Sequence, residues 1–377
     1  MVNSRTELAQ RLIGSFDLCE ICFSIQTGAA IVGKGSRTDC FICKGLWRKI
    51  DSLIKALQSR SRQYEFHSFQ IGLRLSRQIV ENEDHIRSLH KIRGRENIKF
   101  VMTKIIREKF AELSGKKLEV LNPDIVIVIS IENNYDDFGL SIRSRSLTLK
   151  GYYKKKCRGM STECTNLMVR PEDTPCTIED MLRSELISVT RADSISFSWL
   201  GKEDKDSLVL GRGRPFFATM KNPKKRFLKH DLQMGSNDIC IKISRNPVIM
   251  PARLPAFISR IRAIVSCGLN EEIIPSDLVG LNNNDILCVS FSNRQTLVIK
   301  LVYSMRAKKI DRKRFSLTVV SDGGLPIKRF VDGFGETRPN IADLLRKDCK
   351  CDIFDILNLY VQESYTPFFN IEPGLRP

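Results

Sequence analysis

The sequence predicts an α+β protein that begins with a small metal-binding module. Two C-x-x-C pairs lie near the N-terminus, at residues 19–22 and 40–43. Residues 46–150 then mix helical and strand periodicities, as a small α/β domain does. Beyond residue 150 several short strand-like runs follow, so we expect a larger domain built on a mixed sheet. The predicted domains are 1–45, 46–150 and 151–377.

The charge balance of the chain points to a polyanionic partner. Its 377 residues include 61 Lys and Arg against 43 Asp and Glu, a formal net charge of +18. Nucleic acid is the first interpretation, an acidic membrane surface the second, and a merely soluble basic protein the alternative. No apolar run approaches the roughly 20 residues of a membrane span, and the N-terminus lacks a signal peptide's apolar core. We expect a soluble, cytoplasmic monomer with no membrane attachment and no obligate protein partner.

The N-terminal cysteines have the spacing of a metal site. Cys19, Cys22, Cys40 and Cys43 form two knuckles separated by seventeen residues. Each knuckle can place two thiolates on one tetrahedral ion. Two disulfides are the alternative, which a reducing compartment disfavours, and a redox role would need only one knuckle. Because four cysteines leave no open coordination position, the sequence predicts a structural zinc ion.

Residues 46–150 are expected to alternate between helices and strands. Apolar residues recur at helical spacing in two segments, and the second carries basic residues on its opposite face. Four other segments have the short apolar runs of strands. The expected helices are 46–57 and 96–110, and the expected strands are 66–73, 125–129, 140–142 and 147–149. This order suits an RNA-binding domain, although a basic helix face alone is usually just solvated.

A basic segment at residues 151–161 is expected to mark the boundary with the larger domain. It combines Tyr153 with Lys154, Lys155 and Arg158 in a turn-rich stretch. Cations beside an aromatic ring suit contacts with RNA phosphates and bases. A plain basic linker is the alternative. Apolar residues at 178–186 then predict a short helix.

An acidic loop at residues 203–206 follows the next predicted strand. Apolar and serine residues alternate over 194–199, which is the pattern of a half-buried strand. Residues 207–210 and 215–220 predict two more strands, with glycines as turn residues between them. A carboxylate held on such a loop can be presented to a bulky substrate. The alternative is a solvated charged turn.

The stretch 201–216, with the basic residues 221–226 after it, resembles the catalytic loop of a tRNA pseudouridine synthase. The similar family is archaeal and eukaryotic, is the tenth in the usual numbering, and carries an N-terminal THUMP-type RNA-binding domain. It reads Gly-Arg-Glu-Asp-Val-Asp and then Leu-Gly-x-Gly-Arg-Pro-Phe, and this chain has Lys202 at the first arginine. Lysine keeps the charge but not the planar fork. The resemblance implies that Asp204 is the nucleophile.

The resemblance extends over nearly the whole chain. It includes the paired cysteine knuckles, the Asn-Pro-Asp sequence before the aliphatic run at 125–129, and residues 151–159, where it favours RNA contact over a linker. In the final third, residues 262–265, 323–331 and 337–345 resemble family segments of the substrate pocket. Ile261 and Pro326 stand where the family has tyrosines. The pocket implied by the resemblance consists of Lys328, Ile261, Pro326, Ile327 and Leu345.

The resemblance implies a reaction and a partner. The family converts uridine to pseudouridine in the TΨC arm of tRNA, at positions 54 and 55, without an energy source or organic cofactor. THUMP domains imply recognition of a tRNA end by shape and backbone. Lys328, as the basic partner of Asp204, would keep the carboxylate ionised in a partly desolvated pocket.

Two rival functions remain open on the sequence. A catalytically silent tRNA-binding protein or chaperone would explain the charge, the cysteines and the missing tyrosines, but not the acidic loop with Lys328. A different THUMP-bearing enzyme, such as a methyltransferase, would need a glycine-rich cofactor loop after a parallel strand. The sequence has no G-x-G-x-x-G or P-loop pattern.

Overall fold

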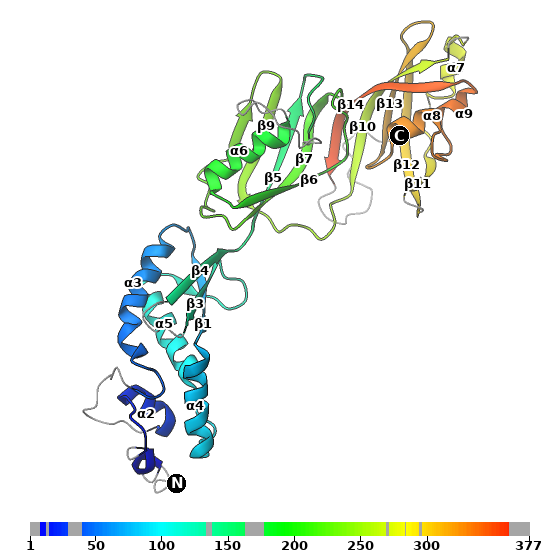
Figure 1. Ribbon diagram of the computed structural model, residues 1–377. Coiled ribbons are helices and arrows are strands. Elements are labelled where there is room, and N and C mark those ends of the chain that lie inside the picture. The colour runs from blue at the N-terminus through cyan, green and yellow to red at the C-terminus, as the bar shows by residue number, and fades with distance from the viewer. Residues whose placement is uncertain are drawn as a thin grey trace. The chain divides into compact units, whose positions relative to one another are not determined.

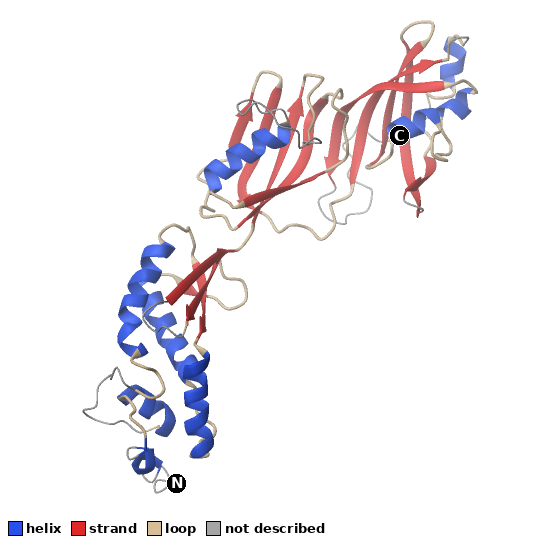
Figure 2. Cartoon of the chain, viewed as in Figure 1, coloured by secondary structure: helices blue, strands red, loops and turns tan. Residues whose placement is uncertain are grey.

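The computed structural model describes two compact units, each with helices and a sheet (Figure 2). The first unit comprises Met1–Ser146, Thr190–Asp193 and Lys221–Arg226, and the second comprises Leu147–Val189, Ser194–Met220 and Phe227–Pro377. The predicted α+β class is confirmed. No helix in the described part of the chain is both long and apolar enough to span a bilayer. The described residues are 8–12, 15–28, 40–132, 138–162, 177–268, 271–282, 284–293 and 296–361.

The first unit packs helices against a four-stranded sheet of order β2-β1-β3-β4. β1 is parallel to both β2 and β3, and β4 is antiparallel to β3. Figure 1 shows α3 and α5 beside this sheet. The strands are β1 (Ser68–Arg74), β2 (Lys117–Leu118), β3 (Ile125–Ile131) and β4 (Phe138–Ser144). The helices are α2 (Glu20–Thr27), η1 (Leu46–Lys49), α3 (Ile50–Ser61), α4 (Arg77–Leu89) and α5 (Ile98–Ser114).

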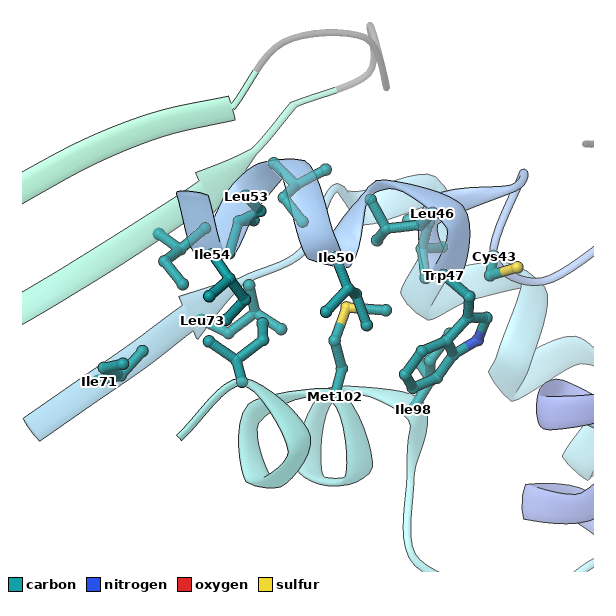
Figure 3. Close-up of a cluster of buried hydrophobic side chains, with 14 of the residues drawn as sticks. Cys43, Leu46, Trp47, Ile50, Leu53, Ile54, Ile71, Leu73, Ile98 and Met102 are labelled. Carbon is teal, nitrogen blue, oxygen red and sulfur yellow. The ribbon is translucent and has the colours of Figure 1, made fainter. Parts of the chain in front are cut away.

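A single apolar core joins the elements of this unit. Side chains spaced three and four residues apart on η1 and α3 meet those of α5 and β1, as Figure 3 shows for Ile50 with Met102 and for Ile54 with Leu73. The same core takes in the four N-terminal cysteines. Each fully buried side chain of this kind, such as Phe110, contributes about 1.5–3 kcal/mol.

Helix α4, which the sequence analysis did not predict, is fixed by a buried carboxylate. Glu83 is only 4% exposed. It accepts hydrogen bonds from Nε2 of Gln26 at 2.8 Å and from the backbone N–H of Ile98 at 2.9 Å, and it pairs with Arg87 one turn later. Because these partners lie on α2, α4 and the start of α5, one side chain ties three helices together.

The second unit is built on a ten-stranded sheet of order β11-β12-β13-β10-β14-β7-β5-β9-β8, with β6 paired to β7. β14 and β7 are parallel and meet through the pair Ile356 and Val209. Figure 1 shows α6 over the β5–β9 part of the sheet. The strands are β5 (Leu147–Lys155), β6 (Ser194–Trp199), β7 (Val209–Lys221), β8 (Leu232–Gly235), β9 (Ile239–Pro247), β10 (Phe257–Cys267), β11 (Leu287–Asn293), β12 (Thr296–Lys309), β13 (Arg314–Asp322) and β14 (Cys349–Val361).

Four described helices cover parts of this unit. They are α6 (Ile178–Thr190), α7 (Pro275–Val279), α8 (Ile327–Asp332) and α9 (Ile341–Leu345). The apolar side chains of α8, such as Phe330, share one buried core with alternate residues of β10 and β13, including Ala263 and Leu317, and α8 contacts β14. The helix α8 is thereby held against β14, the middle strand in the sheet order.

Two strand predictions need correction in this unit. Residues 207–220 do not form two strands with a glycine turn between them, because β7 runs unbroken through Gly211 and Gly213. Both glycines have left-handed φ angles, +55° and +86°, and an added Cβ would lie 2.2 Å from the Leu357 carbonyl or 2.6 Å from that of Tyr153. They therefore kink the strand where neighbouring backbone approaches closely.

Two further segments differ from the prediction. Residues 151–155 are the second half of β5 and lie inside the sheet, so they are no turn-rich boundary. Residues 327–332, which we compared with a family strand, form the short helix α8 after Pro326. Proline at a helix start loses no intrahelical hydrogen bond, which explains why the chain can begin a helix there.

Candidate active site and metal centre

The acidic loop lies between β6 and β7 and presents Asp204 to a cation. Oδ2 of Asp204 lies 2.6 Å from Nζ of Lys328, which α8 carries. The two side chains are 45% and 52% exposed. The hydrogen bond from Lys328 to Asp204 raises the pKa of Lys328 above its ordinary value, although partial burial acts in the other direction. An exposed pair of this kind adds little stability; its main consequence is that the carboxylate is held in one direction.

A buried lysine supports the backbone of this loop from within the protein. Lys155 is 0% exposed. Its Nζ donates hydrogen bonds to the carbonyls of Met160 at 2.8 Å, Lys205 at 3.1 Å and Asp204 at 3.4 Å. The ammonium group thus binds the loop at the nucleophile candidate itself.

The charge of Lys155 is balanced by the residue before Asp204. Oε1 of Glu203 lies 3.3 Å from Nζ of Lys155, and the Glu203 side chain is 2% exposed. Oε1 also accepts a hydrogen bond from the hydroxyl of Thr162. Because Glu203 is buried while Asp204 is half-exposed, the loop directs two consecutive carboxylates to opposite sides. A buried pair is costly to form, but breaking it costs more.

The start of the loop is held by Arg214 of β7. Its Nε donates to the carbonyl of Leu200 at 2.9 Å, its Nη2 donates to that of Gly201, and its Nη1 donates to the hydroxyl of Tyr153 at 3.0 Å. Burial raises the pKa of Tyr153 above its ordinary value. The planar guanidinium therefore joins β6, β7 and β5 beneath the loop.

The end of the loop is held by Asp355 of β14. This carboxylate accepts hydrogen bonds from Arg158 at 2.8 Å, from the Leu208 N–H at 3.0 Å and from Arg262 at 3.0 Å. Burial would raise the pKa of Asp355, but these three donors hold it below its ordinary value. Arg158 also donates to the carbonyl of Asp206. Both ends of the loop are thus anchored to different strands.

A cavity of about 580 Å³ lies beside Lys328, the ion-pair partner of Asp204. Lys328 lines it, and so do Gly201 and Lys202 of the loop. Four of the five pocket residues implied by the sequence lie here: Ile261, Pro326, Ile327 and Lys328. Three aromatic residues that the sequence analysis missed also line it, namely Phe257, Phe291 and Phe354. Leu345, in contrast, is not among the described residues that line the cavity. It packs against the apolar core that includes Phe330 of α8.

The structure separates the four residues that we expected to contact RNA. Tyr153 and Lys155 are both 0% exposed, so neither has surface for RNA, and that expectation is corrected to a role inside the protein. Lys154 and Arg158 are partly exposed. The sequence did carry a sign of this burial. Residues two apart on a strand share a face, so Tyr153 and Lys155 lie on the same face as the apolar Leu149, which is buried.

The four N-terminal cysteines form a cluster that could hold a metal ion. Cys19, Cys22, Cys40 and Cys43 are all buried, and their sulfurs lie within 4.8 Å of one another. Sγ of Cys19 and Sγ of Cys43 are 3.7 Å apart, close to the ~3.8 Å edge of a tetrahedron with metal–sulfur bonds of about 2.3 Å. The indole N–H of Trp47 donates to Sγ of Cys22 at 3.3 Å, which would stabilise a thiolate there.

Comparisons with known proteins agree with this architecture. The family model described as "Pus10 THUMP domain, archaeal" matches residues 53–130, and the one described as "Pus10, C-terminal" matches residues 148–249 and 290–363. Together they span most of the chain, and the second includes both Asp204 and Lys328.

Several relatives are named tRNA pseudouridine synthase Pus10. That of Nitrosopumilus maritimus (strain SCM1) is 29% identical over 388 residues, covering 94% of this chain and 98% of that protein. That of Cenarchaeum symbiosum (strain A) is 28% identical, covering 95% and 90%, and that of Methanocaldococcus jannaschii is 26% identical, covering 86% and 76%. With both family models matched in order along the chain, this protein belongs to the Pus10 family.

Proposed function

We propose that this protein is a tRNA pseudouridine synthase that acts on uridines 54, 55 or both in the TΨC arm, with Asp204 as its nucleophile. The observation that carries the proposal is the half-exposed Asp204 carboxylate, paired with Lys328 beside an apolar cavity. The names of the relatives support the reaction and the substrate class. The position of the target uridine comes from the resemblance of the loop.

The reaction requires little more than a positioned carboxylate. Asp204 forms a covalent bond to the sugar or the base, the N1–C1′ bond breaks, the uracil turns over, C5 joins C1′, and the bond to Asp204 breaks to release the carboxylate. The proton that leaves C5 is balanced by the one that N1 takes up, so the product is an isomer and no organic cofactor is needed. Lys328 pairs with the carboxylate that must attack and holds it in one direction.

The cavity suits a uracil that has left its stack. Extracting the nucleotide costs roughly a few kcal/mol, which contacts in the pocket must offset. Ile261 and Pro326 cover part of the cavity with aliphatic surface. Phe257 is the more exposed of the three phenylalanines, and its ring is seated on Gly323, where an added Cβ would come within 2.4 Å of it. We infer that Phe257 supplies the aromatic surface that the missing tyrosines would have given.

Phe257→Ala is expected to lower kcat/KM for pseudouridine formation about tenfold to a hundredfold, because base–aromatic stacking is worth about 1–3 kcal/mol. Phe257→Tyr keeps an aromatic face and should stay within a fewfold of the original enzyme. Steady-state assays of both variants on one tRNA transcript provide the measurement. Full activity in the alanine variant would remove Phe257 from the pocket's recognition of the base.

The RNA partner is supported by charge and by the matched THUMP model. The net charge of +18 favours a polyanion, and residues 53–130 match a THUMP domain. In this proposal residues 46–150 bind the tRNA end, and residues 151–377 carry the chemistry. The partly exposed Lys154 and Arg158 remain proposed RNA contacts.

The proposal is tested by mapping pseudouridine in unmodified tRNA transcripts after incubation with the pure protein. New pseudouridine at position 54 or 55 is the expected result. Binding of tRNA without any pseudouridine formation would instead support a catalytically silent tRNA-binding protein. The replacement of the two family tyrosines would be consistent with that function. Pseudouridine only outside the TΨC arm would keep the enzyme but change its target.

We propose further that the cysteine cluster holds a structural zinc ion. Zinc bound by four thiolates supplies folding free energy and has no open position for catalysis. The four sulfurs belong to the same core as Trp47 and Leu46, so the ion would stabilise the first unit. It would take no part in the reaction at Asp204.

Removal of this metal is expected to unfold part of the first unit. Cys22→Ser combined with Cys40→Ser should abolish zinc binding, lower the melting temperature and weaken tRNA binding. Cys288→Ser, which changes an exposed thiol, is the matched control and should leave all three unchanged. Metal analysis of protein purified without chelator should find one zinc per chain, and its absence would defeat this proposal.

A further inference from the structure

A second hollow crosses the large sheet outside the proposed catalytic cavity. It has a volume of about 930 Å³ and is lined by residues of β8, β9, β5, β7 and β14. We call it the sheet groove and define it by Lys150, Tyr152, Lys154, Arg212 and Lys242. Of the five residues that define it, the function proposed above uses Lys154 alone.

The sheet groove lies on the face of β5 that points away from the catalytic loop. Tyr153 and Lys155 face the loop and its supporting side chains. Successive residues of a strand point to opposite sides, so Lys150, Tyr152 and Lys154 share the other face. Leu359 of β14 lines both the groove and the cavity. The two hollows therefore adjoin at β14, where β7 meets β14 through a single residue pair.

The groove combines cations with an accessible aromatic ring. Among the described residues that line it, four are basic and one, Asp231, is acidic. The Asp231 carboxylate accepts a hydrogen bond from the backbone N–H of Arg245 at 2.9 Å. Tyr152 is 36% exposed, and Lys242 lies directly opposite it on β9.

The arrangement of these groups favours an unpaired strand. Lys150 and Lys154 flank Tyr152 on the same face, two residues away on either side, so a ring sits among three cations. Ammonium groups around an aromatic ring can bind backbone phosphates while a base stacks on the ring. A duplex hides the faces of its bases, whereas single-stranded RNA exposes them.

We propose that the sheet groove binds a single-stranded segment of RNA. Lys150, Lys154 and Lys242 contact its phosphates, and Tyr152 stacks on one of its bases. Because the groove adjoins the cavity at Leu359, the segment bound there can belong to the same RNA whose uridine enters the cavity. This binding needs no uridine and no reaction, so it can be tested apart from the proposed catalysis.

The test uses the full-length protein and a fluorescent oligoadenylate of about twelve nucleotides, within the range of single-strand sites. Without uridine it cannot be a substrate. Fluorescence anisotropy should show binding that Tyr152→Ala weakens about tenfold and that Tyr152→Phe restores. Lys154→Ala with Lys242→Ala should weaken it at least tenfold and reduce the log–log salt slope by about 1.4, since each phosphate contact on a single strand contributes about 0.7.

The matched control removes two exposed cations elsewhere on the same sheet. Arg306→Ala with Lys308→Ala changes β12, outside the groove, and should alter oligoadenylate affinity less than twofold. Equal losses in the control and groove variants would reduce the effect to general charge and overturn the proposal. Unchanged binding in Tyr152→Ala, or an RNA duplex that competes as well as the single strand, would overturn it too.

Discussion

Asp204→Asn is expected to bind tRNA about as tightly as the original chain and to form no pseudouridine. Asparagine is nearly isosteric with aspartate but is not a nucleophile, so the fall in kcat should be about a thousandfold or more. Binding should persist because Asp204 forms one exposed ion pair, which contributes little to the fold. Pseudouridine mapping and a tRNA filter-binding assay on the same preparation measure both quantities.

The matched control is Asp206→Asn, two residues along the same loop. Asp206 meets Arg158 through its backbone carbonyl, and a change of its side chain leaves that contact in place. We expect measurable turnover in this variant. Pseudouridine formation by Asp204→Asn at the original rate would rule out Asp204 as nucleophile.

Lys155→Met is expected to lower the free energy of unfolding of the second unit, because Lys155 belongs to a buried ion pair. Removing the ammonium leaves Glu203 as a buried charge without its cation, and breaking such a pair costs about 3–5 kcal/mol. It also removes the donor for two loop carbonyls, those of Asp204 and Lys205, and for that of Met160. Denaturant unfolding should show that loss, and kcat should fall about a hundredfold or more because Asp204 is no longer positioned.

Two companion variants separate stability from positioning. Lys154→Met changes the neighbouring side chain on the other face of β5 and should keep the free energy of unfolding. Lys155→Met with Glu203→Gln removes both charges, so it should recover much of the stability, while kcat stays low because the loop still lacks its donor. A Lys155→Met protein as stable as the original would contradict the buried pair. Recovery of kcat in the double variant would reduce Lys155 to a structural role.

The parts of the site that the sequence predicted are those encoded locally. The cysteine knuckles carry their ligands at fixed spacing, and the acidic loop has its carboxylate within one short stretch. The position of β6 followed from strict alternation of serine and apolar residues. In these cases the interacting residues are near neighbours in the chain, so spacing alone carries the information.

The missed features depend on partners distant in sequence. A Gly-x-Gly signal is the same for a turn and for a kinked strand, and only the approach of Leu357 and Tyr153 decides that β7 continues. Asp355 gave no sign of holding the loop, because its partners Arg158 and Leu208 lie about 150 to 200 residues earlier. The burial of Lys155 could have been predicted, since strand alternation places it on the inner face of the sheet. We expected it on the surface because lysine is rarely buried.

The anchoring of the acidic loop between β6 and β7 has a mechanical consequence. Its first residues are tied to β7 through Arg214, and its last are tied to β14 through Asp355. These two strands belong to the two halves of the ten-stranded sheet and share one pair of residues, Val209 and Ile356. The loop therefore spans the junction at which the two halves of the sheet meet. A change in the spacing of the two halves would therefore alter the position of the Asp204 carboxylate that the loop carries.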